Sequence, residues 1–175
     1  MSNDRSRIAF DLFYAEHASP AYRFALRLCG NRDDAEDLAA EAFAKAFRRW
    51  SQYRGDAAAR SWLFAIILNE WKMACRKQKP PQDSLERASQ LAQTLQLPDV
   101  DLARAILALP ENNRVAFLLV KGEGLSHAEA AKVMRVPVGT MYFRVHRAVT
   151  QLRALLDDPA DETEIPQEVT YQHEM

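Results

Sequence analysis

Glycine, cysteine and long hydrophobic runs are all scarce in this chain of 175 residues, and each scarcity excludes a class of protein. Only five glycines, together with many Ala, Leu, Arg and Glu residues, favour helices over strands. No segment reaches the roughly 18 consecutive apolar residues that a membrane-spanning helix needs. The first eight residues lack the hydrophobic region of a secretory signal. We therefore expect an all-helical, cytoplasmic protein without membrane insertion.

The two cysteines, Cys29 and Cys75, have no partner at the Cys-x-x-Cys spacing. Each lies within an apolar helical pattern, so we expect both to be buried small hydrophobic residues rather than parts of a disulfide or a zinc site. The four histidines show no metal-ligand spacing, and the sequence contains no nucleophile motif or phosphate-binding loop. The sequence therefore predicts no cofactor, no metal and no enzymatic activity.

The net charge of −1 hides a strongly uneven distribution. Residues 1–79 carry a net charge of +4, residues 80–103 one of −3, residues 104–156 one of +5 and residues 157–175 one of −7. Two basic blocks are thus separated by an acidic spacer and followed by an acidic tail. Basic blocks of this kind are compatible with nucleic-acid binding, although the average charge is not.

The apolar periodicity predicts an all-α fold with two small helical domains joined by a flexible linker. In the first domain, residues 1–79, we expect a helical stretch that closes at Gly30-Asn31, a helix from about 33 to 50, a loop over 51–59 and a helix from about 60 to 79. The linker is residues 80–103, rich in Gln and Ser, with one weak helix near 85–95. Residues 104–156 form the second domain, with helices expected at about 102–109, 111–121, 127–134 and 138–156. Residues 157–175 are expected to form an acidic flexible tail.

Residues 126–153 have the pattern of a helix-turn-helix. Ser126 and Glu129 form a capping box at the start of the first helix, and Val136-Pro137 forces a turn before the second. In the second helix the apolar positions share one face and predict its core side: Met141, Val145, Ala148 and Leu152. The opposite side presents Thr140, Tyr142, Phe143, Arg144 and Arg147.

This opposite side is suited to the major groove of DNA. Arginine pairs with guanine through two hydrogen bonds, threonine contacts phosphate or a thymine methyl group, and aromatic rings cover apolar base edges. Two arginines alone are also typical of an ordinary solvated helix face. The capping box, the tight turn and the exposed Tyr142-Phe143 pair favour a DNA-reading function.

Two groups of motifs together resemble the bacterial extracytoplasmic-function (ECF, group IV) sigma factors of the sigma-70 family. The second domain resembles region 4 in residues 107–114 (LALPENNR), 124–131 (GLSHAEAA), 136–140 (VPVGT) and 144–148 (RVHRA). The first domain resembles region 2 in residues 34–38 (DAEDL), 41–43 (EAF), 53–56 (YRGD), 60–63 (RSWL) and Asn69. The resemblance covers most of residues 8–79 and 104–156, in the expected order.

The resemblance implies a subunit that binds core RNA polymerase and directs promoter-specific transcription, with region 2 opening the −10 element and region 4 reading the −35 element. The partners it implies are the β′ clamp and β flap of the polymerase, promoter DNA and an anti-sigma factor. An acidic and apolar helix face would repel phosphate and makes sense as the polymerase-binding surface: Asp34, Glu36, Asp37, Leu38 and Glu41. The dipole of the helix explains the first of these acids but not Glu41, two turns further on.

Between residues 45 and 79, nine basic residues face only two acidic ones, and aromatic residues are interleaved among them. Basic grooves with aromatic platforms hold unpaired bases. The resemblance implies that this segment holds the −10 element through Arg54, Arg60, Asn69, Lys72 and Arg76. Trp62 and Phe64 are better explained as core residues. For the −35 element it implies Thr140, Tyr142, Phe143, Arg144 and Arg147.

Two departures from the family concern the helix-turn-helix. The family usually has glycine near Arg135, and a residue other than glycine in the left-handed conformation costs roughly 1 kcal/mol, so we expect a slightly different turn. Tyr142-Phe143 stands where small or basic residues are commoner, which predicts an unusual −35 preference.

The alternative function is a freestanding helix-turn-helix regulator, with residues 8–79 serving dimerisation or ligand binding. Such a regulator would bind duplex DNA specifically without polymerase, whereas a sigma factor would bind DNA weakly on its own. By sequence, only the motifs that resemble region 2 separate the two.

Overall fold

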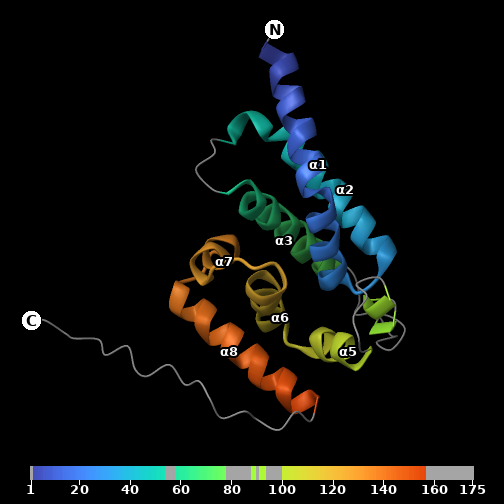
Figure 1. The fold of residues 1–175 in the computed structure, drawn as a ribbon, viewed down its shortest axis with the longest axis vertical. Helices are drawn as coiled ribbons and strands as arrows, with labels where there is room; N and C mark the ends of the chain where they lie inside the picture. The colour runs from blue at the N-terminus through green and yellow to red at the C-terminus, as the bar shows by residue number, and fades with distance from the viewer. Residues whose placement is uncertain (1, 54–57, 78–87, 90, 94–99, 157–175) are drawn as a thin grey trace, which may run out of the picture.

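The computed structural model describes residues 2–53, 58–77, 88–89, 91–93 and 100–156. Arg54, most of the expected linker and the acidic tail of residues 157–175 lie outside the described residues. Every element in the described part of the chain is helical, as the sequence predicted. Figure 1 shows two groups of helices, with the first three above and the remaining four below.

The first group consists of α1 (Ser2–Cys29), α2 (Arg32–Arg48), a short 3₁₀ turn η1 (Trp50–Gln52) and α3 (Ala59–Lys77). The three helices pack against one another in every pairwise combination. The expected end of the first helical stretch is confirmed, since Gly30 adopts a φ of 75° and its N–H donates to the carbonyl of Leu26 at 2.7 Å. A left-handed glycine directly after a helix is a common termination signal. The next helix begins at once, with Asn31 capping it by accepting from the N–H of Asp34 at 2.9 Å.

The interior of this group is apolar and rich in aromatic rings. Phe24 and Phe64 are fully buried with their ring centroids 4.7 Å apart, which confirms Phe64 as a core residue. At the end of the group nearest the 51–59 segment, aromatic residues pack in a second cluster: Phe10, Phe13, Trp50, Tyr53 and Trp62. This cluster joins the starts of α1 and α3 to the 3₁₀ turn.

The second group consists of α5 (Val100–Ala108), α6 (Glu111–Phe117), a π-helical turn η2 (Leu118–Gly122), α7 (His127–Met134) and α8 (Val138–Leu155). The π turn continues α6, and the N–H of Glu123 donates to the carbonyl of Leu118 at 2.8 Å. Such turns are rare and occur mostly at functional positions. α8 packs across α5, α6 and α7 as the long helix of the group.

The described parts of the expected linker are helical or buried. α5 begins at Val100, inside the range of 80–103, and Ala88, Leu91 and Ala92 belong to the hydrophobic core. These residues therefore anchor part of the connection between the two groups.

Two expectations about burial were wrong. Cys29 is buried as predicted, but Cys75 is exposed, because the last turn of α3 extends beyond the helices that cover its middle. Phe47 lies at the edge of the apolar stripe of α2 and is exposed, although its ring contacts that of Phe10 with centroids 5.0 Å apart.

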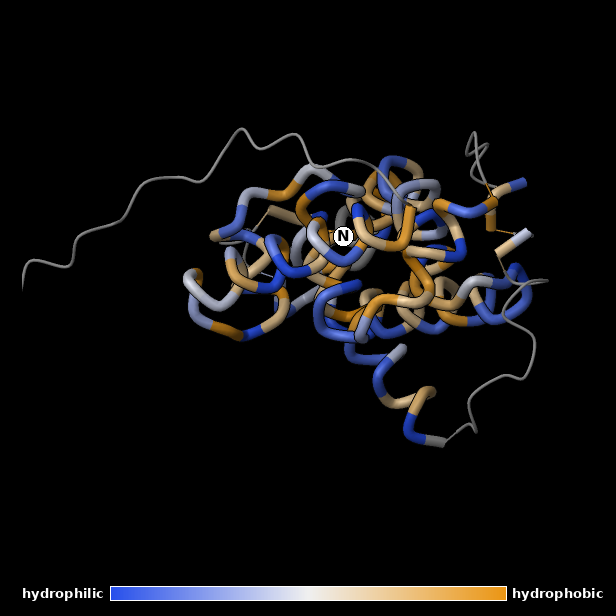
Figure 2. Tube along the Cα trace, turned by 90° about the horizontal axis from the view of Figure 1, so that it is seen from below, coloured by the Kyte–Doolittle hydropathy of each residue, from blue (hydrophilic) through white to orange (hydrophobic). Residues whose placement is uncertain are grey.

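Hydrophobic and hydrophilic residues alternate within a few positions along the helices in Figure 2. This pattern fits helices that bury one side only. Within the part of the chain that the structure describes, no helix combines the length and apolar character needed to cross a membrane.

Candidate nucleic-acid interface

The helix-turn-helix has the local geometry that its sequence predicted. Ser126 accepts from the N–H of Glu129 at 3.2 Å, while the Glu129 carboxylate accepts from the N–H of Ser126 at 2.9 Å. These two bonds complete the capping box of α7 and lower the pKa of Glu129. α7 and α8 begin and end within one residue of the expected positions.

The turn between α7 and α8 keeps a left-handed residue at its first position. Arg135 takes this conformation, with φ 55° and ψ 50°, and its N–H donates to Lys132 at 3.2 Å. The different turn that we expected is therefore not seen, since Arg135 itself occupies the region that glycine favours.

The two sides of α8 are divided as predicted. Its four expected core residues are all buried: Met141, Val145, Ala148 and Leu152. On the other side, Tyr142 is 57% exposed, Phe143 is 60% exposed and Arg147 is exposed, while Thr140 and Arg144 are half-buried. These five side chains form one accessible surface, called here the recognition face: Thr140, Tyr142, Phe143, Arg144 and Arg147.

Neighbouring side chains orient the aromatic residues of the recognition face. The imidazole of His127, from the first turn of α7, stacks on Tyr142. Burial and, to a smaller extent, the charge of Lys121 lower the pKa of His127, which favours a neutral ring in this stack. The guanidinium carbon of Arg147 lies 5.6 Å from the centre of the Phe143 ring, in a cation–π arrangement.

The acidic residues of α2 form a second surface. Four carboxylates are exposed in its first half: Asp34, Glu36, Asp37 and Glu41. Leu38 is only 8% exposed, so it supports this surface from below and offers little area to a partner. Glu41 is partly neutralised by Arg48 at 3.2 Å and Lys45 at 3.8 Å, which gives that residue a local partner that the sequence reasoning had not assigned. These four carboxylates are called the acidic face below.

The structure divides the residues predicted for the −10 element between two sides of α3. Asn69 and Arg76 are exposed and Lys72 is half-buried, and their spacing of three or four positions places them near one side. Arg60 lies nine positions before Asn69, which at 3.6 residues per turn is roughly half a turn away. Arg60 therefore does not share a surface with the others.

The aromatic cluster near the 51–59 segment combines core and surface character. Trp50, Tyr53 and Trp62 are half-buried, and the Tyr53 ring lies 5.5 Å from Trp50 and 4.9 Å from Trp62 between ring centroids. Trp62 thus packs into the domain, as expected, but keeps part of its surface accessible. A preformed aromatic cluster of this kind can stack on an unpaired base.

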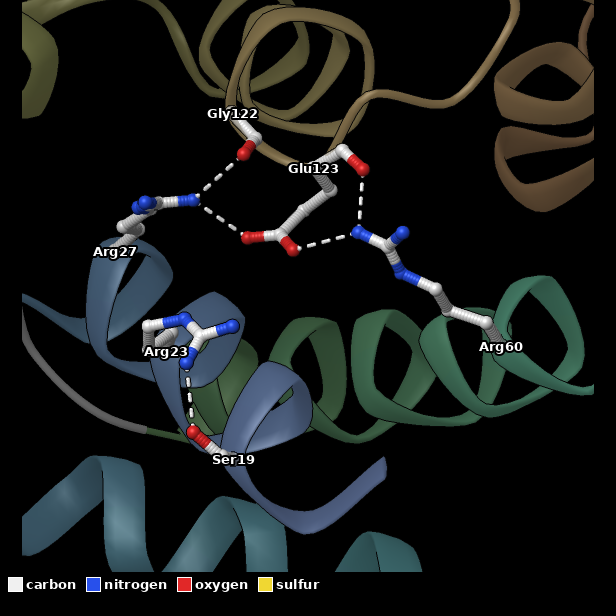
Figure 3. Close-up of polar contacts among 6 residues, drawn as sticks. All are labelled: Ser19, Arg23, Arg27, Arg60, Gly122 and Glu123. Carbon is white, nitrogen blue, oxygen red and sulfur yellow. Dashed lines mark hydrogen bonds and ion pairs between the residues drawn. The ribbon is translucent and has the colours of Figure 1, made fainter. Parts of the chain in front are cut away.

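Sequence reasoning missed the contacts that join the two groups of helices. Glu123 is the one buried carboxylate among the described residues, with a side chain only 3% exposed. Its Oε1 accepts from Arg27 Nη1 at 2.6 Å, and its Oε2 accepts from Arg60 Nη2 at 3.1 Å (Figure 3). The backbone carbonyls of Gly122 and Glu123 also accept, from Arg27 at 3.1 Å and from Arg60 respectively. Glu123 with Arg27 and Arg60 is called the Glu123 bridge below.

Further packing surrounds the Glu123 bridge. α3 lies against α7, and α1 contacts the π turn η2. The guanidinium carbon of Arg114, from α6, lies 5.4 Å from the ring centre of Trp71, from α3. The −10 candidate Arg60 is consequently engaged inside the contact between the domains, while the recognition face remains exposed.

The two groups of helices coincide with two family models. Sigma-70 region 2 matches residues 13–80, and Sigma-70 region 4 matches residues 99–152. Among named relatives, the RNA polymerase sigma-H factor of Pseudomonas aeruginosa is 32% identical over 80% of this chain and 82% of its own. The ECF RNA polymerase sigma factor EcfG of Rhodopseudomonas palustris is 33% identical over 79% and 81%.

Solved structures of similar proteins share the fold. The sigma factor RpoE in complex with the anti-sigma factor NepR from Bartonella quintana gives a TM-score of 0.68, with 26% identity over 85% of this chain and 98% of that one. CnrH in complex with the cytosolic domain of CnrY gives 0.69, with 27% identity over 88% and 91%.

The chain belongs to the sigma-70 family and, within it, to the ECF RNA polymerase sigma factors. It is a sigma factor, a transcription initiation factor without enzymatic activity that directs core RNA polymerase to promoter DNA. The alternative of a freestanding regulator is excluded, because residues 13–80 match region 2.

Proposed function

We propose that three surfaces of this sigma factor divide the work of initiation between them. The acidic face of α2 binds the β′ clamp of core polymerase, region 4 contacts the β flap, and promoter DNA binds the remaining surfaces. The observation that supports this division is the segregation of charge, with exposed carboxylates gathered in the first half of α2 and basic residues on α3 and α8. Phosphate repels the first surface and is attracted by the others.

The recognition face of α8 reads the −35 element in the major groove. Its core side is fully buried and its DNA side is exposed, which is the arrangement that a recognition helix needs. Arg144 and Arg147 supply base or phosphate contacts, while Tyr142 and Phe143 provide apolar contact with base edges. Because both aromatic rings are held by neighbours, their contribution favours particular −35 sequences.

The −10 element binds along α3 and the aromatic cluster. Asn69, Lys72 and Arg76 line one side of the helix, and Trp50, Tyr53 and Trp62 offer rings beside its start. Arg54, outside the described residues, and Arg60 complete the set that we assign to this element. Region 2 covers residues 1–79, residues 80–103 connect the domains, and region 4 covers residues 104–156.

Distances along DNA require the two domains to separate during this function. The −35 and −10 elements are centred about 25 base pairs apart, which at about 3.4 Å per base pair is roughly 80 Å. In the structure α3 and α7 pack directly against each other. The chain described here is therefore a closed form, and reading both elements at once requires it to open on the polymerase.

We assign the action of this protein to the cytoplasm, where RNA polymerase works, and expect an anti-sigma factor as its regulator. The similar sigma factors RpoE and CnrH are seen in complexes with NepR and CnrY, of which NepR is named as an anti-sigma factor. The closed form presents both domains together to such a partner.

Run-off transcription with purified core polymerase over a pool of genomic promoters tests the proposed function. We expect transcripts that depend on this protein and share one −35 and one −10 motif at a fixed spacing. A transcript pattern identical to that of core polymerase alone would contradict the proposal.

A further inference from the structure

We propose that Arg27 and Arg60 form a binding site for a backbone phosphate of promoter DNA, and that Glu123 occupies this site in the closed form. The inference rests on the proposed function and adds one site to it. Arg27 is outside every surface considered so far. It comes from the last turn of α1, whereas Arg60 comes from the first turn of α3.

The geometry of the Glu123 bridge is that of an anion held between two cations. One carboxylate oxygen contacts each guanidinium, at 2.6 Å for Arg27 and 3.1 Å for Arg60. A phosphodiester likewise presents two terminal oxygens on one centre, and guanidinium groups bind carboxylate and phosphate in the same way. The carboxylate of Glu123 can therefore stand in for phosphate.

The closed form leaves part of this site unused. Among the described residues, the Nε of Arg60 is buried and has no hydrogen-bond partner, because Nη2 makes both contacts with Glu123. Arginine commonly binds phosphate through two parallel N–H groups. A third oxygen on a phosphate group offers an acceptor that one carboxylate and one carbonyl do not supply.

The partner side of the contact is electrostatically suited to fill the site. α6 and η2 form a continuous helix whose last carbonyls carry partial negative charge, and the carbonyl of Gly122 accepts from Arg27. A Cβ atom on Gly122 would lie 3.0 Å from Arg27 Nη1, so the guanidinium approaches the backbone closely there. The end of this helix thus offers carboxylate and carbonyl oxygens together.

Separation of the domains removes these oxygens from the two arginines. Two guanidinium groups then remain side by side on region 2, whose residues 1–79 carry a net charge of +4. Such a pair attracts an anion, and in the open form the polyanion at hand is the promoter. Closure and phosphate binding at this site are mutually exclusive, so Glu123 also limits DNA binding by the free chain.

The experiment compares Glu123→Gln, Arg27→Gln and Arg23→Gln in the full-length chain, free and with core polymerase. Arg23 is the matched control, since it lies one turn before Arg27 on α1 and contacts only Ser19 of its own helix in Figure 3. Small-angle scattering measures the radius of gyration of each free chain. Fluorescence anisotropy measures binding to a promoter duplex, and circular dichroism checks that each variant is folded.

For the free chain, we expect Glu123→Gln to increase the radius of gyration and to raise DNA affinity by about ten-fold, because the open fraction increases. For the polymerase-bound form, Arg27→Gln should weaken promoter binding by about ten-fold and reduce the slope of log K against log salt by about 0.9. Glu123→Gln and Arg23→Gln should leave promoter binding by the polymerase complex unchanged.

Two results would overturn the inference. A free Glu123→Gln chain as compact as the wild type would remove the role of Glu123 in closure. Wild-type promoter binding by the Arg27→Gln polymerase complex, or loss of polymerase binding instead, would remove the phosphate site. If the unchanged protein itself gave no promoter-dependent transcription, the proposed function would fail instead, which is a separate outcome.

Discussion

The imidazole ring of His127 lies parallel to the phenol ring of Tyr142, with ring centroids 3.9 Å apart and planes 10° apart. His127 begins α7 and Tyr142 belongs to α8, so the stack connects the two helices of the helix-turn-helix on their exposed side. The contact couples the DNA-reading surface to the protonation state of one histidine.

Replacement of His127 by phenylalanine should reduce the dependence of stability on pH between about 7 and 5. The pKa of His127 is lowered in the folded chain, so the unfolded chain binds the proton first. The contribution of His127 is therefore complete above about pH 6.5 and is lost as the pH falls below it. Urea unfolding at pH 5.5 and 7.5 measures the difference, and an equal pH dependence in both proteins would contradict the prediction.

Replacement of Arg135 by glycine should stabilise the chain by about 0.5–1 kcal/mol. The left-handed conformation of Arg135 costs roughly 1–2 kcal/mol, and the greater freedom of glycine in the unfolded chain offsets part of the gain. Urea unfolding followed by circular dichroism checks the change. Arg153→Gly, in the last turn of α8, is the control and should destabilise the chain, because glycine is a poor helix former.

Replacement of Arg147 by alanine should weaken −35-dependent transcription by about 5-fold to 150-fold, the equivalent of 1–3 kcal/mol for one specific base contact. The Phe143 ring holds the guanidinium, and both side chains point away from the core. Affinity for core polymerase should not change. Arg153→Ala removes another exposed arginine from α8 as the control. Loss of polymerase binding in Arg147→Ala would disprove the assignment of the recognition face.

Charge reversal at Asp37 and Glu41 together should lower affinity for core polymerase by about ten-fold or more, because like charges would then face each other across the contact. Both side chains are exposed on α2. Glu16→Lys reverses an exposed acid on α1 and serves as the control. A pull-down with core polymerase measures binding, and an unchanged yield for the double variant would remove the acidic face from this interface.

Local sequence signals predicted most of the second domain. The capping box at Ser126 and the turn at Pro137 identify their helix ends, since each depends on residues only a few positions apart. The core side of α8 followed from helical periodicity alone. The same reasoning separated Asn69 from Arg60, had the nine-residue spacing been converted into helical angle.

The contact between the domains could not be predicted in this way. Glu123 lies 96 positions from Arg27 and 63 from Arg60, and only the tertiary arrangement brings them together. The available signal was a single acid between Gly122 and Gly124 in a basic domain, which is also typical of a solvated loop. The π turn that points Glu123 inward has no signature in the sequence.

The position of Trp71 gives the closed form an intrinsic optical reporter. Its indole is 4% exposed and lies beneath Arg114 of region 4, whereas Trp50 and Trp62 belong to the aromatic cluster of region 2. Departure of region 4 would remove a cation from the Trp71 ring and admit solvent to it. The emission of that one residue therefore changes with domain separation, without any attached dye.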